Sequence, residues 1–229
     1  MIDQRIKIQY LFHSGFSVEI KDRLFIFDYM EGEINSGGKK TFVFSSHSHH
    51  DHFNPVIFDW QKVNQDIKYI LSDDIPVPER KSNIYSIAPD EEIQVEGVKI
   101  KAYGSTDLGV SFLVRWAEVT LFHAGDLNWW YWWDDSPEEI KRAEKDYKYE
   151  ISKIKGQAID VAFFPVDPRL EHNFSLGADY FIQEIVPRIL IPMHFGEDTE
   201  VPGQYAAKMK ENHTKIMVLS KRGEEIILL

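Results

Sequence analysis

The residues best suited to chemistry lie in one short run, His47-Ser48-His49-His50-Asp51-His52. It holds four of the nine histidines of the chain and one carboxylate in six consecutive positions. In an extended segment residues i and i+2 point to the same side, so His47 and His49 can converge on one metal ion. Asp51 and His52 follow, where a strand that turns into a helix would aim them at a neighbouring ion. Imidazole and carboxylate ligands suit zinc, and also manganese or iron.

The segments around this run indicate how it is positioned. An apolar, strand-like segment, Thr41–Ser46, precedes the run and argues against a solvated polar loop. Asn54 is the predicted N-cap of a short helix, Pro55–Gln61, with proline at its first position. Short β-rich segments separated by turn residues predict further strands at Arg5–Phe12, Phe16–Ile20, Leu24–Asp28, Ile67–Leu71, Ile84–Ile87, Glu92–Val95, Val98–Tyr103, Val110–Val114 and Val119–Phe122.

Helices become more frequent in the second half of the chain. Ser136-Pro137-Glu138-Glu139 has the form of a capping box, and apolar residues then recur at spacings of three and four, which predicts an amphipathic helix. Strands are predicted at Ile159–Pro165, at Ile189–Pro192 and on both sides of Lys221–Gly223; a loop follows the first of these, and helices are predicted at Ala178–Val186 and Gln204–Asn212. Because strands and helices interleave without a linker or a repeat, we expect one α/β domain spanning residues 1–229.

Composition and charge narrow the function classes. The chain has 229 residues, 43% of them hydrophobic, and no stretch of apolar residues long enough for a membrane span or a secretory signal. The absence of cysteine removes disulfides and thiolate ligands and is compatible with the cytoplasm, where we expect the protein. A formal charge of −11 argues against a nonspecific nucleic-acid surface. We expect a small-molecule substrate and no membrane partner, with the oligomeric state open.

Two further strand ends carry metal-ligand side chains. Leu121–Asp126 ends in Gly125-Asp126, where glycine allows a close turn that presents the carboxylate. Ile189–His194 ends in an imidazole. Such ends open onto the rim of a sheet, which is a common place for a site.

Together these motifs resemble the metallo-β-lactamase superfamily of metal-dependent hydrolases, which has an αββα sandwich fold. The superfamily's His-x-His-x-Asp-His motif matches His47, His49, Asp51 and His52; its Gly-Asp motif matches Gly125-Asp126; and its late histidine matches His194. The motifs span residues 10 to 195. Within the superfamily, the stretches His123–Asp126 and Pro192–His194 look most similar to the ascorbate-6-phosphate lactonase-like branch.

The resemblance implies one or two divalent metal ions, most simply zinc, with manganese or iron as alternatives. One ion would be held by His47, His49 and Asp126. The other would be held by Asp51, His52, Asp126 and His194. A metal-bound hydroxide would attack an ester, lactone or phosphoester bond of a small molecule. Asp51 or Asp126 would be the catalytic carboxylate that receives the proton.

The sequence departs from the family pattern at one place. The family usually supplies a third histidine to the first ion from a loop between the two early motifs, and the corresponding segment here, Tyr103–Gly109, contains none. Asp107 can substitute as an oxygen ligand, which would favour manganese, or Ser105 can bind weakly or through water. Alternatively Asp107 is a plain turn residue and the first site is weak, so that the protein works with one metal ion.

Other residues are candidates for supporting roles. Metal-bound histidines need partners on their second ring nitrogen, and Asp28 is a candidate for this place. His13, near the first strand end, is a candidate for a role in the site, and either residue could instead bind a metal ion. His172 and Arg169, on the loop after a buried strand, are candidates for substrate contact. In the aromatic run Trp129–Trp133, Trp129 and Trp130 either line a pocket beside the metal ions or pack the helix that begins at Ser136 onto the sandwich.

Three alternatives to a small-molecule hydrolase stay open. A phosphodiesterase or nuclease of the same fold would need a basic groove. A redox iron protein would be identified by bound iron. A non-catalytic metal-binding protein would follow if the His47/His49 site is empty. The measured metal content distinguishes several of these.

Overall fold

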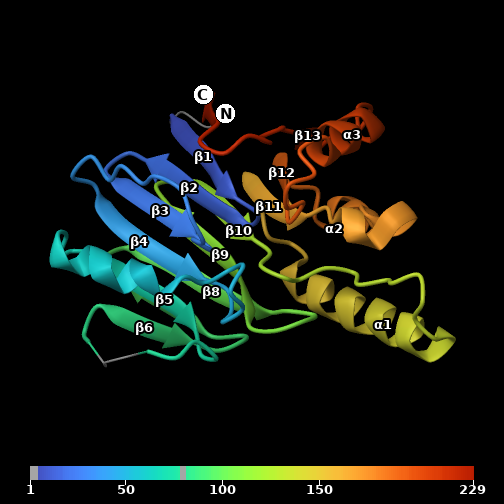
Figure 1. The fold of residues 1–229 in the computed structure, drawn as a ribbon, viewed down its shortest axis with the longest axis horizontal. Coiled ribbons are helices and arrows are strands. Elements are labelled where there is room, and N and C mark those ends of the chain that lie inside the picture. Colours follow the sequence, from blue (N-terminus) through green and yellow to red (C-terminus); the bar gives the residue numbers. More distant parts are fainter. Residues whose placement is uncertain (1–4, 78–80) are drawn as a thin grey trace.

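The computed structural model describes residues 5–77 and 81–229, whose strands form two sheets packed face to face (Figure 1). The first sheet has the strand order β14 (Glu225–Leu228), β1 (Ile6–Phe12), β2 (Gly15–Ile20), β3 (Arg23–Phe27), β4 (Lys40–Ser45), β5 (Lys68–Ser72) and β6 (Ile84–Ile87). The second has the order β13 (Lys215–Ile216), β12 (Ile189–Met193), β11 (Val161–Pro165), β10 (Val119–His123), β9 (Val110–Trp116), β8 (Val98–Gly104) and β7 (Glu92–Val95).

Helices cover the outer faces of both sheets. The 3₁₀ helix η1 (Pro55–Lys62) lies outside the first sheet, beside β4 and β5 (Figure 1). The second sheet is covered by α1 (Pro137–Ile154), α2 (Leu176–Ile185) and α3 (Val201–Lys208), with a short 3₁₀ helix, η2 (Pro168–Asn173), after β11. The layers are therefore helix, sheet, sheet and helix, as expected for an αββα sandwich.

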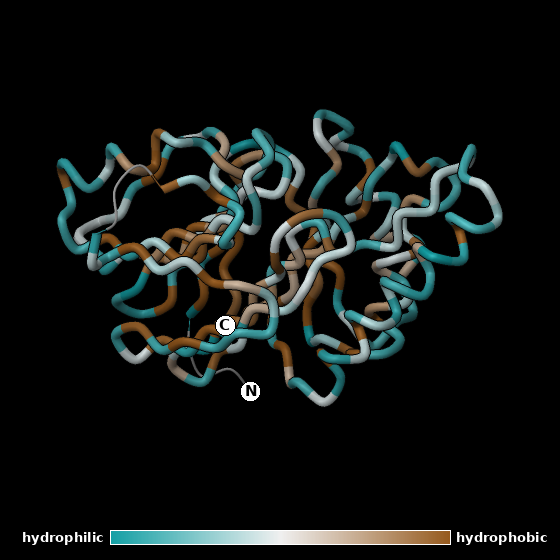
Figure 2. The backbone as a smooth tube through the Cα atoms, turned by 90° about the horizontal axis from the view of Figure 1, so that it is seen from below, coloured by the Kyte–Doolittle hydropathy of each residue, from teal (hydrophilic) through white to brown (hydrophobic). Residues whose placement is uncertain are grey.

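The main core lies between the sheets. Phe16 of β2 packs on Phe163 of β11 with ring centroids 4.5 Å apart, and Phe44 of β4 meets Phe112 of β9 at 5.3 Å. A second, smaller cluster joins η1 to the outer face of the first sheet, with Ile57 fully buried. Figure 2 shows the same distribution, with hydrophobic segments running through the interior and hydrophilic ones at the periphery.

Local sequence signals explain the helix starts. Asn54 accepts a hydrogen bond from the Val56 amide at the start of η1, which confirms the predicted cap. Ser136 and Glu139 form the predicted capping box of α1, whose buried face carries Tyr147, Ile151 and Ile154.

The structure corrects three predicted elements. The helix predicted at Gln204–Asn212 is α3, which starts earlier because Pro202 suits a first turn, and it ends at Lys208. The described residues directly before Lys221 form no strand, and the two-residue β13 lies a few residues earlier. The segment predicted as a loop after β11 contains η2, because Asp167 caps it and Pro168 begins it. Among the described residues, no helix is long and apolar enough to cross a membrane.

Candidate metal centre

The candidate site lies where several strands end at one rim of the sandwich. β3 and β4 pair in parallel, and so do β10, β11 and β12, so their carboxyl ends meet at the same edges. A histidine or an aspartate follows each of these five strands within three residues: Asp28, His47, Asp126, Asp167 and His194.

Unusual backbone conformations aim these residues into the site. Gly125 has φ of +53°, and a Cβ there would lie 2.7 Å from the Ser46 Cβ, so only glycine fits before Asp126. His13 and His194 have φ of +55° and +66°. The His194 amide donates to the His13 carbonyl at 3.1 Å, and this bond ties the two sheets together at the site.

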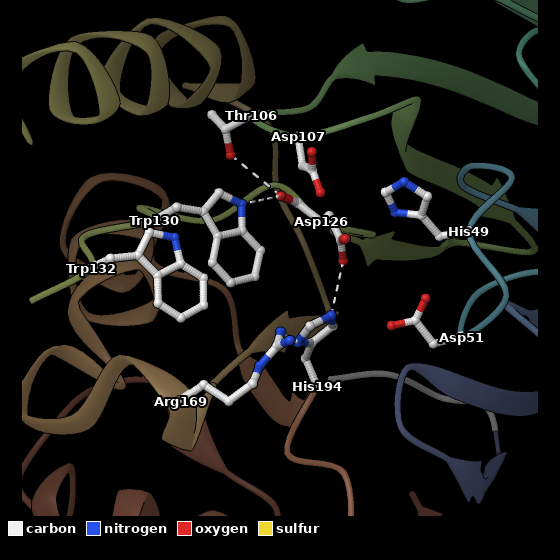
Figure 3. Close-up of a pocket in the computed structure, with 9 residues that line it drawn as sticks. All are labelled: His49, Asp51, Thr106, Asp107, Asp126, Trp130, Trp132, Arg169 and His194. Carbon is white, nitrogen blue, oxygen red and sulfur yellow. Dashed lines mark hydrogen bonds and ion pairs between the residues drawn. The ribbon is translucent and has the colours of Figure 1, made fainter. Parts of the chain in front are cut away.

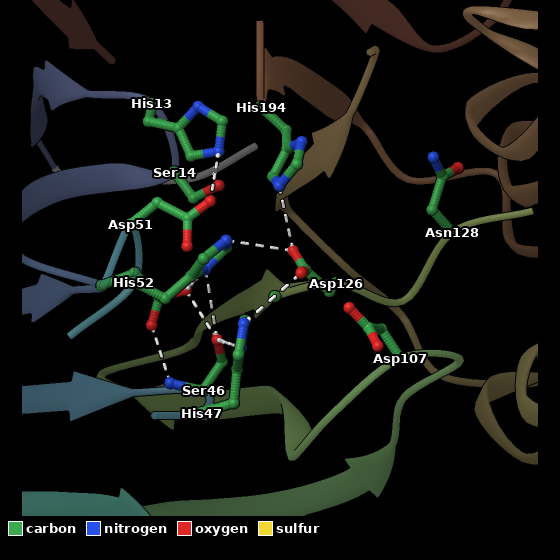
Figure 4. A network of polar contacts seen from close by, with 12 residues as sticks. His13, Ser14, Ser46, His47, Asp51, His52, Asp107, Asp126, Asn128 and His194 are labelled. Atoms are coloured by element: carbon green, nitrogen blue, oxygen red, sulfur yellow. Dashed lines mark hydrogen bonds and ion pairs between the residues drawn. The ribbon is translucent and has the colours of Figure 1, made fainter. Parts of the chain in front are cut away.

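Asp126 is the centre of the arrangement (Figure 4). Its Oδ1 lies 3.0 Å from His52 Nε2 and 3.1 Å from His194 Nε2, and its Oδ2 lies 3.4 Å from His47 Nε2. The residue is only 5% exposed. One side chain therefore faces imidazoles from three separate positions along the chain.

The ligand atoms form two groups, within each of which all atoms lie within 4.8 Å of one another. One group contains His47, His49 and Asp126; the other contains His13, Asp51, His52 and His194. Because Asp126 Oδ1 faces the second group and Oδ2 the first, the carboxylate stands between them. The sets implied by the family resemblance are thus brought together, and His13 joins the second.

The outer nitrogens of the three buried histidines that face Asp126 all have partners. His52 Nδ1 lies 2.7 Å from Asp28, His194 Nδ1 lies 2.9 Å from Asp167, and His47 Nδ1 lies 3.0 Å from the Ser46 hydroxyl. These contacts leave Nε2 of each ring pointing at Asp126.

The inner atoms, by contrast, lie against one another and have no further polar partner within the described residues. The Nε2 atoms of His13, His47, His52 and His194 and Oδ1 of Asp126 are all buried and make no hydrogen bond within the described part of the chain. Buried polar atoms almost always make a hydrogen bond. Around a metal ion, each histidine usually bonds a protein group through one ring nitrogen and binds the ion through the other. The donor set of imidazoles and carboxylates therefore fits a divalent cation such as zinc.

The electrostatics of the cluster also favour bound positive charge. Burial raises the pKa of Asp126, but the surrounding histidines outweigh this and hold it well below the ordinary value. Burial opposes the charged form of His52, yet Asp126 and Asp28 raise its pKa to about 10. His13 behaves differently, because burial lowers its pKa to about 3 and keeps it a neutral imidazole.

Beside the cluster is an open hollow of about 380 Å³ (Figure 3), lined by His49, Asp51, Thr106, Asp107, Asp126, Trp130, Trp132, Arg169 and His194. Trp130 and Trp132 stack with their rings nearly parallel, at 6°. The Arg169 guanidinium lies over Trp132 and pairs with Asp167. A small molecule in the hollow would meet the inner side of the cluster directly.

The predicted supporting residues fall into distinct places. Asp28 contacts His52 as expected of a residue that orients a ligand. Asp107 is exposed and lines the hollow but belongs to neither ligand group. Ser105 does not line the hollow; its hydroxyl accepts a bond from the Asp107 amide at 3.4 Å. Asp107 therefore reaches the hollow beside the cluster, and Ser105 does not.

The aromatic run divides between the two interpretations. Trp129 packs against Tyr147 of α1 and Tyr180 of α2, away from the hollow, so its predicted place beside the substrate is corrected. Trp130 does line the hollow. Trp132, which sequence reasoning did not single out, lines it too, because residues two apart face the same way in an extended segment.

Asp167 and Thr106 were also missed by sequence reasoning. Asp167 carries the same signal as Asp126, an acid just after a buried strand. The Thr106 hydroxyl donates to the Asn128 carbonyl at 2.6 Å and holds the loop after β8 against the segment after Asp126. Arg169 reaches the hollow, but His172 is exposed and does not line it, because the chain kinks at Glu171.

An Asp167→Asn variant should bind zinc about 10- to 100-fold more weakly than the wild type. The amide cannot hold the Nδ1 proton of His194 as a carboxylate does, so the imidazole becomes a poorer and less well oriented ligand. Competition with a chromogenic chelator measures the affinity. The exposed Asp59→Asn serves as control, and equal affinity in the two variants would remove Asp167 from this role.

Comparisons with known proteins agree with this architecture. No model of a known protein family matches the chain. It is 27% identical over 240 residues to a UPF0173 metal-dependent hydrolase of Nanoarchaeum equitans, covering 97% of this chain and 100% of the relative.

Two solved structures are similar over almost their whole length. Igni18, a metallo hydrolase of Ignicoccus hospitalis, has a TM-score of 0.70 at 16% identity. The match covers 98% of this chain and 99% of Igni18. YhfI of Bacillus subtilis, a metallo-β-lactamase fold protein, has a TM-score of 0.64 at 13% identity, with 98% of this chain and 100% of that one covered. The chain therefore has the metallo-β-lactamase fold, which confirms the predicted αββα sandwich.

Proposed function

We propose that this protein, which has the metallo-β-lactamase fold, is a metal-dependent hydrolase that cleaves an ester, lactone or phosphoester bond of a small molecule. The observation that carries the proposal is the set of buried inner nitrogens of His47, His52 and His194, which face only the Asp126 carboxylate, at one wall of an open hollow. Similarity to a named metal-dependent hydrolase over 97% of the chain supports it. The imidazole-rich donor set favours zinc.

Divalent ions bound here would lower the pKa of a water molecule towards neutrality and polarise the scissile carbonyl or phosphoryl group. The residues of the chain divide the remaining work. His47 and His49 hold one position, and His13, Asp51, His52 and His194 hold the other, on the two sides of Asp126. Asp28 and Asp167 keep the imidazoles turned inward.

Asp51 is better suited than Asp126 to receive a proton during the reaction. Its side chain is 33% exposed and lines the hollow, whereas the Asp126 side chain is buried and already faces three imidazoles. Burial raises the pKa of both carboxyls, but neighbouring histidines hold it below the ordinary value in each, so access to the substrate makes the difference. Asp126 therefore serves as a fixed ligand between the two groups, and Asp51 as the proton acceptor at the side of the substrate.

Finer assignments are proposed from single observations. The ascorbate-6-phosphate lactonase-like branch rests on the similarity of His123–Asp126 and Pro192–His194 alone. A cytoplasmic location is proposed from the absence of cysteine. A small-molecule substrate is proposed because the hollow has a volume of only about 380 Å³.

A hydrolysis screen tests the function. The protein, loaded with zinc, manganese or iron in turn, is offered lactones, carboxylic esters, phosphomonoesters, phosphodiesters and amides. We expect turnover of a lactone, carboxylic ester or phosphoester, dependent on the added metal. No turnover of any class in protein shown to contain its metal would contradict the proposal and favour a binding role.

A His49→Ala variant should retain one equivalent of zinc where the wild type binds two. His49 is exposed and supplies one of only three side chains of its group, so its loss leaves His47 and Asp126 to hold an ion alone, while the other group is untouched. Metal analysis after gel filtration measures the stoichiometry.

The adjacent His50→Ala is the matched control, because His50 is also exposed and belongs to neither group. Two equivalents in both variants would exclude His49 as a ligand. One equivalent in the wild type would mean that the position lacking the family's third histidine does not hold an ion.

A further inference from the structure

A second hollow, of about 230 Å³, adjoins the one beside the metal cluster. The two share Thr106, Trp130 and Trp132 as lining residues, so the stacked indole pair stands at the passage between them. The rest of the second hollow is formed by Asn128 and by residues at and before the start of α1. A molecule that reacts at the cluster can therefore extend past the indoles into this space.

The side-chain amide of Asn128 is the group of the second hollow that indicates a ligand. The residue is 1% exposed, and its Nδ2 makes no hydrogen bond within the described part of the chain. Its main chain is fully engaged, since the amide donates to Thr106 Oγ1 at 3.0 Å and the carbonyl accepts from the same hydroxyl. In Figure 4 it stands apart from the His/Asp cluster, with no contact to it. The side chain packs closely on Gly177, where an added Cβ would lie 2.0 Å from its Oδ1, and a buried donor without a partner is rare unless a ligand supplies the acceptor.

The remaining polar groups of this hollow are mostly acceptors. Asp135, Glu139 and Asp146 line it, against a single guanidinium, that of Arg142. Asp135 accepts from the Trp132 amide at 3.3 Å, and one oxygen of Glu139 is used in the capping box of α1, so each keeps free acceptor capacity.

The combination of several carboxylates with one unpaired amide donor favours some classes of ligand over others. A phosphate or carboxylate would face three carboxylates. An ammonium group would suit the carboxylates but would leave the Asn128 donor unpaired. A hydroxyl both donates and accepts, so a group with several hydroxyls can satisfy the carboxylates and Asn128 together, while its CH faces pack on the flat indoles.

We propose that the hollow lined by Asn128, Trp130, Trp132 and the start of α1 is a subsite for a neutral, hydroxyl-rich part of the substrate, such as a sugar or cyclitol ring, whose scissile bond lies at the metal cluster. Because the subsite holds one end of the hydrolase's substrate, it rests on the proposed function. Its occupation requires no turnover, however, and binding and hydrolysis can be measured separately.

The test is a binding panel on the metal-loaded full-length protein. The probes are methyl glycosides of glucose, galactose and mannose and myo-inositol as neutral polyols, choline and ethanolamine as cations, and glycerate as an anion. Ligand-observed NMR and quenching of tryptophan fluorescence report binding, the latter because two indoles line the hollow. We expect at least one neutral polyol to bind more tightly than every cation and anion.

Variants then locate the binding. Asn128→Ala should weaken polyol binding about 3- to 10-fold and Trp132→Ala by about tenfold. Asp146→Ala, at an exposed position that does not threaten the fold, should weaken it about 3-fold. Trp133→Ala, which removes an indole that is 69% exposed and lines neither hollow, should leave it unchanged.

Preference for the cations or the anion, no binding of any probe, or equal binding by the wild type and the three lining variants would overturn the subsite. A failed hydrolysis screen with polyol binding and its variant pattern intact would instead remove the proposed hydrolase function and leave a polyol-binding site. The two failures are thus distinguishable.

Discussion

An Asp126→Asn variant of the metal-loaded protein should hydrolyse its substrate at least about 10³-fold more slowly than the wild type. Among the described residues, Asp126 is the one carboxylate that faces both ligand groups, and its two oxygens approach three imidazoles within 3.0 to 3.4 Å. Asparagine keeps the shape but removes the negative charge. Loss of several kcal/mol of metal-based transition-state stabilisation corresponds to this factor, at about 1.36 kcal/mol for each tenfold change.

The measurement is kcat/KM on the best substrate of the screen, together with metal content. Asp66→Asn, at an exposed position of the loop before β5, is the matched control and should keep full activity. Wild-type activity in an Asp126→Asn variant that binds its metal normally would show that the chemistry does not depend on this carboxylate.

Removal of metal should lower the melting temperature by roughly 8–16 °C for each ion lost. At a free metal concentration about 1,000 times Kd, binding to the folded state contributes about 4 kcal/mol, and for a chain of this size 1 kcal/mol shifts Tm by about 2–4 °C. The physical source is the cluster of buried inner nitrogens, which face only the Asp126 carboxylate. Scanning calorimetry before and after dialysis against a chelator measures the shift.

His52→Ala provides the control, since it removes a ligand that is fully buried between Asp28 and Asp126. Its melting temperature should respond much less to the chelator than that of the wild type. An unchanged Tm in wild-type protein whose metal content has fallen to zero would contradict the placement of the ions in this cluster.

Much of the secondary structure could be predicted because it depends on neighbouring residues. The capping box of Ser136 and Glu139 and the apolar spacing that follows predict α1 correctly from one segment. The end of α3 differs from the predicted one, since no proline or glycine directly follows Lys208 to mark where the helix stops. Where contacts between residues close in the chain stabilise an element, the sequence is sufficient to predict it.

The candidate site divides in the same way. The spacing of four residues along one segment is itself the signal for His47, His49, Asp51 and His52. Gly125 points to Asp126, because the close turn before this carboxylate has room only for glycine. These residues, together with His194 at the end of an apolar strand, can be named from the sequence alone.

Other members of the site could be recognised only in three dimensions. Asp167 holds His194 from the end of a different strand, and His13 meets His194 across the interface of the two sheets. Asn128 belongs to no motif in the sequence, and only burial reveals its unused donor.

The sequence alone therefore determined the chemistry available to this protein, a set of imidazoles and carboxylates with metal-ligand spacing. The tertiary structure decided which of them meet, which nitrogen of each ring faces inward, and which residues stand beside the substrate. The physical reason is that strand register and the packing of the two sheets bring His13 and His194 together from opposite ends of the chain, and no local pattern encodes that contact.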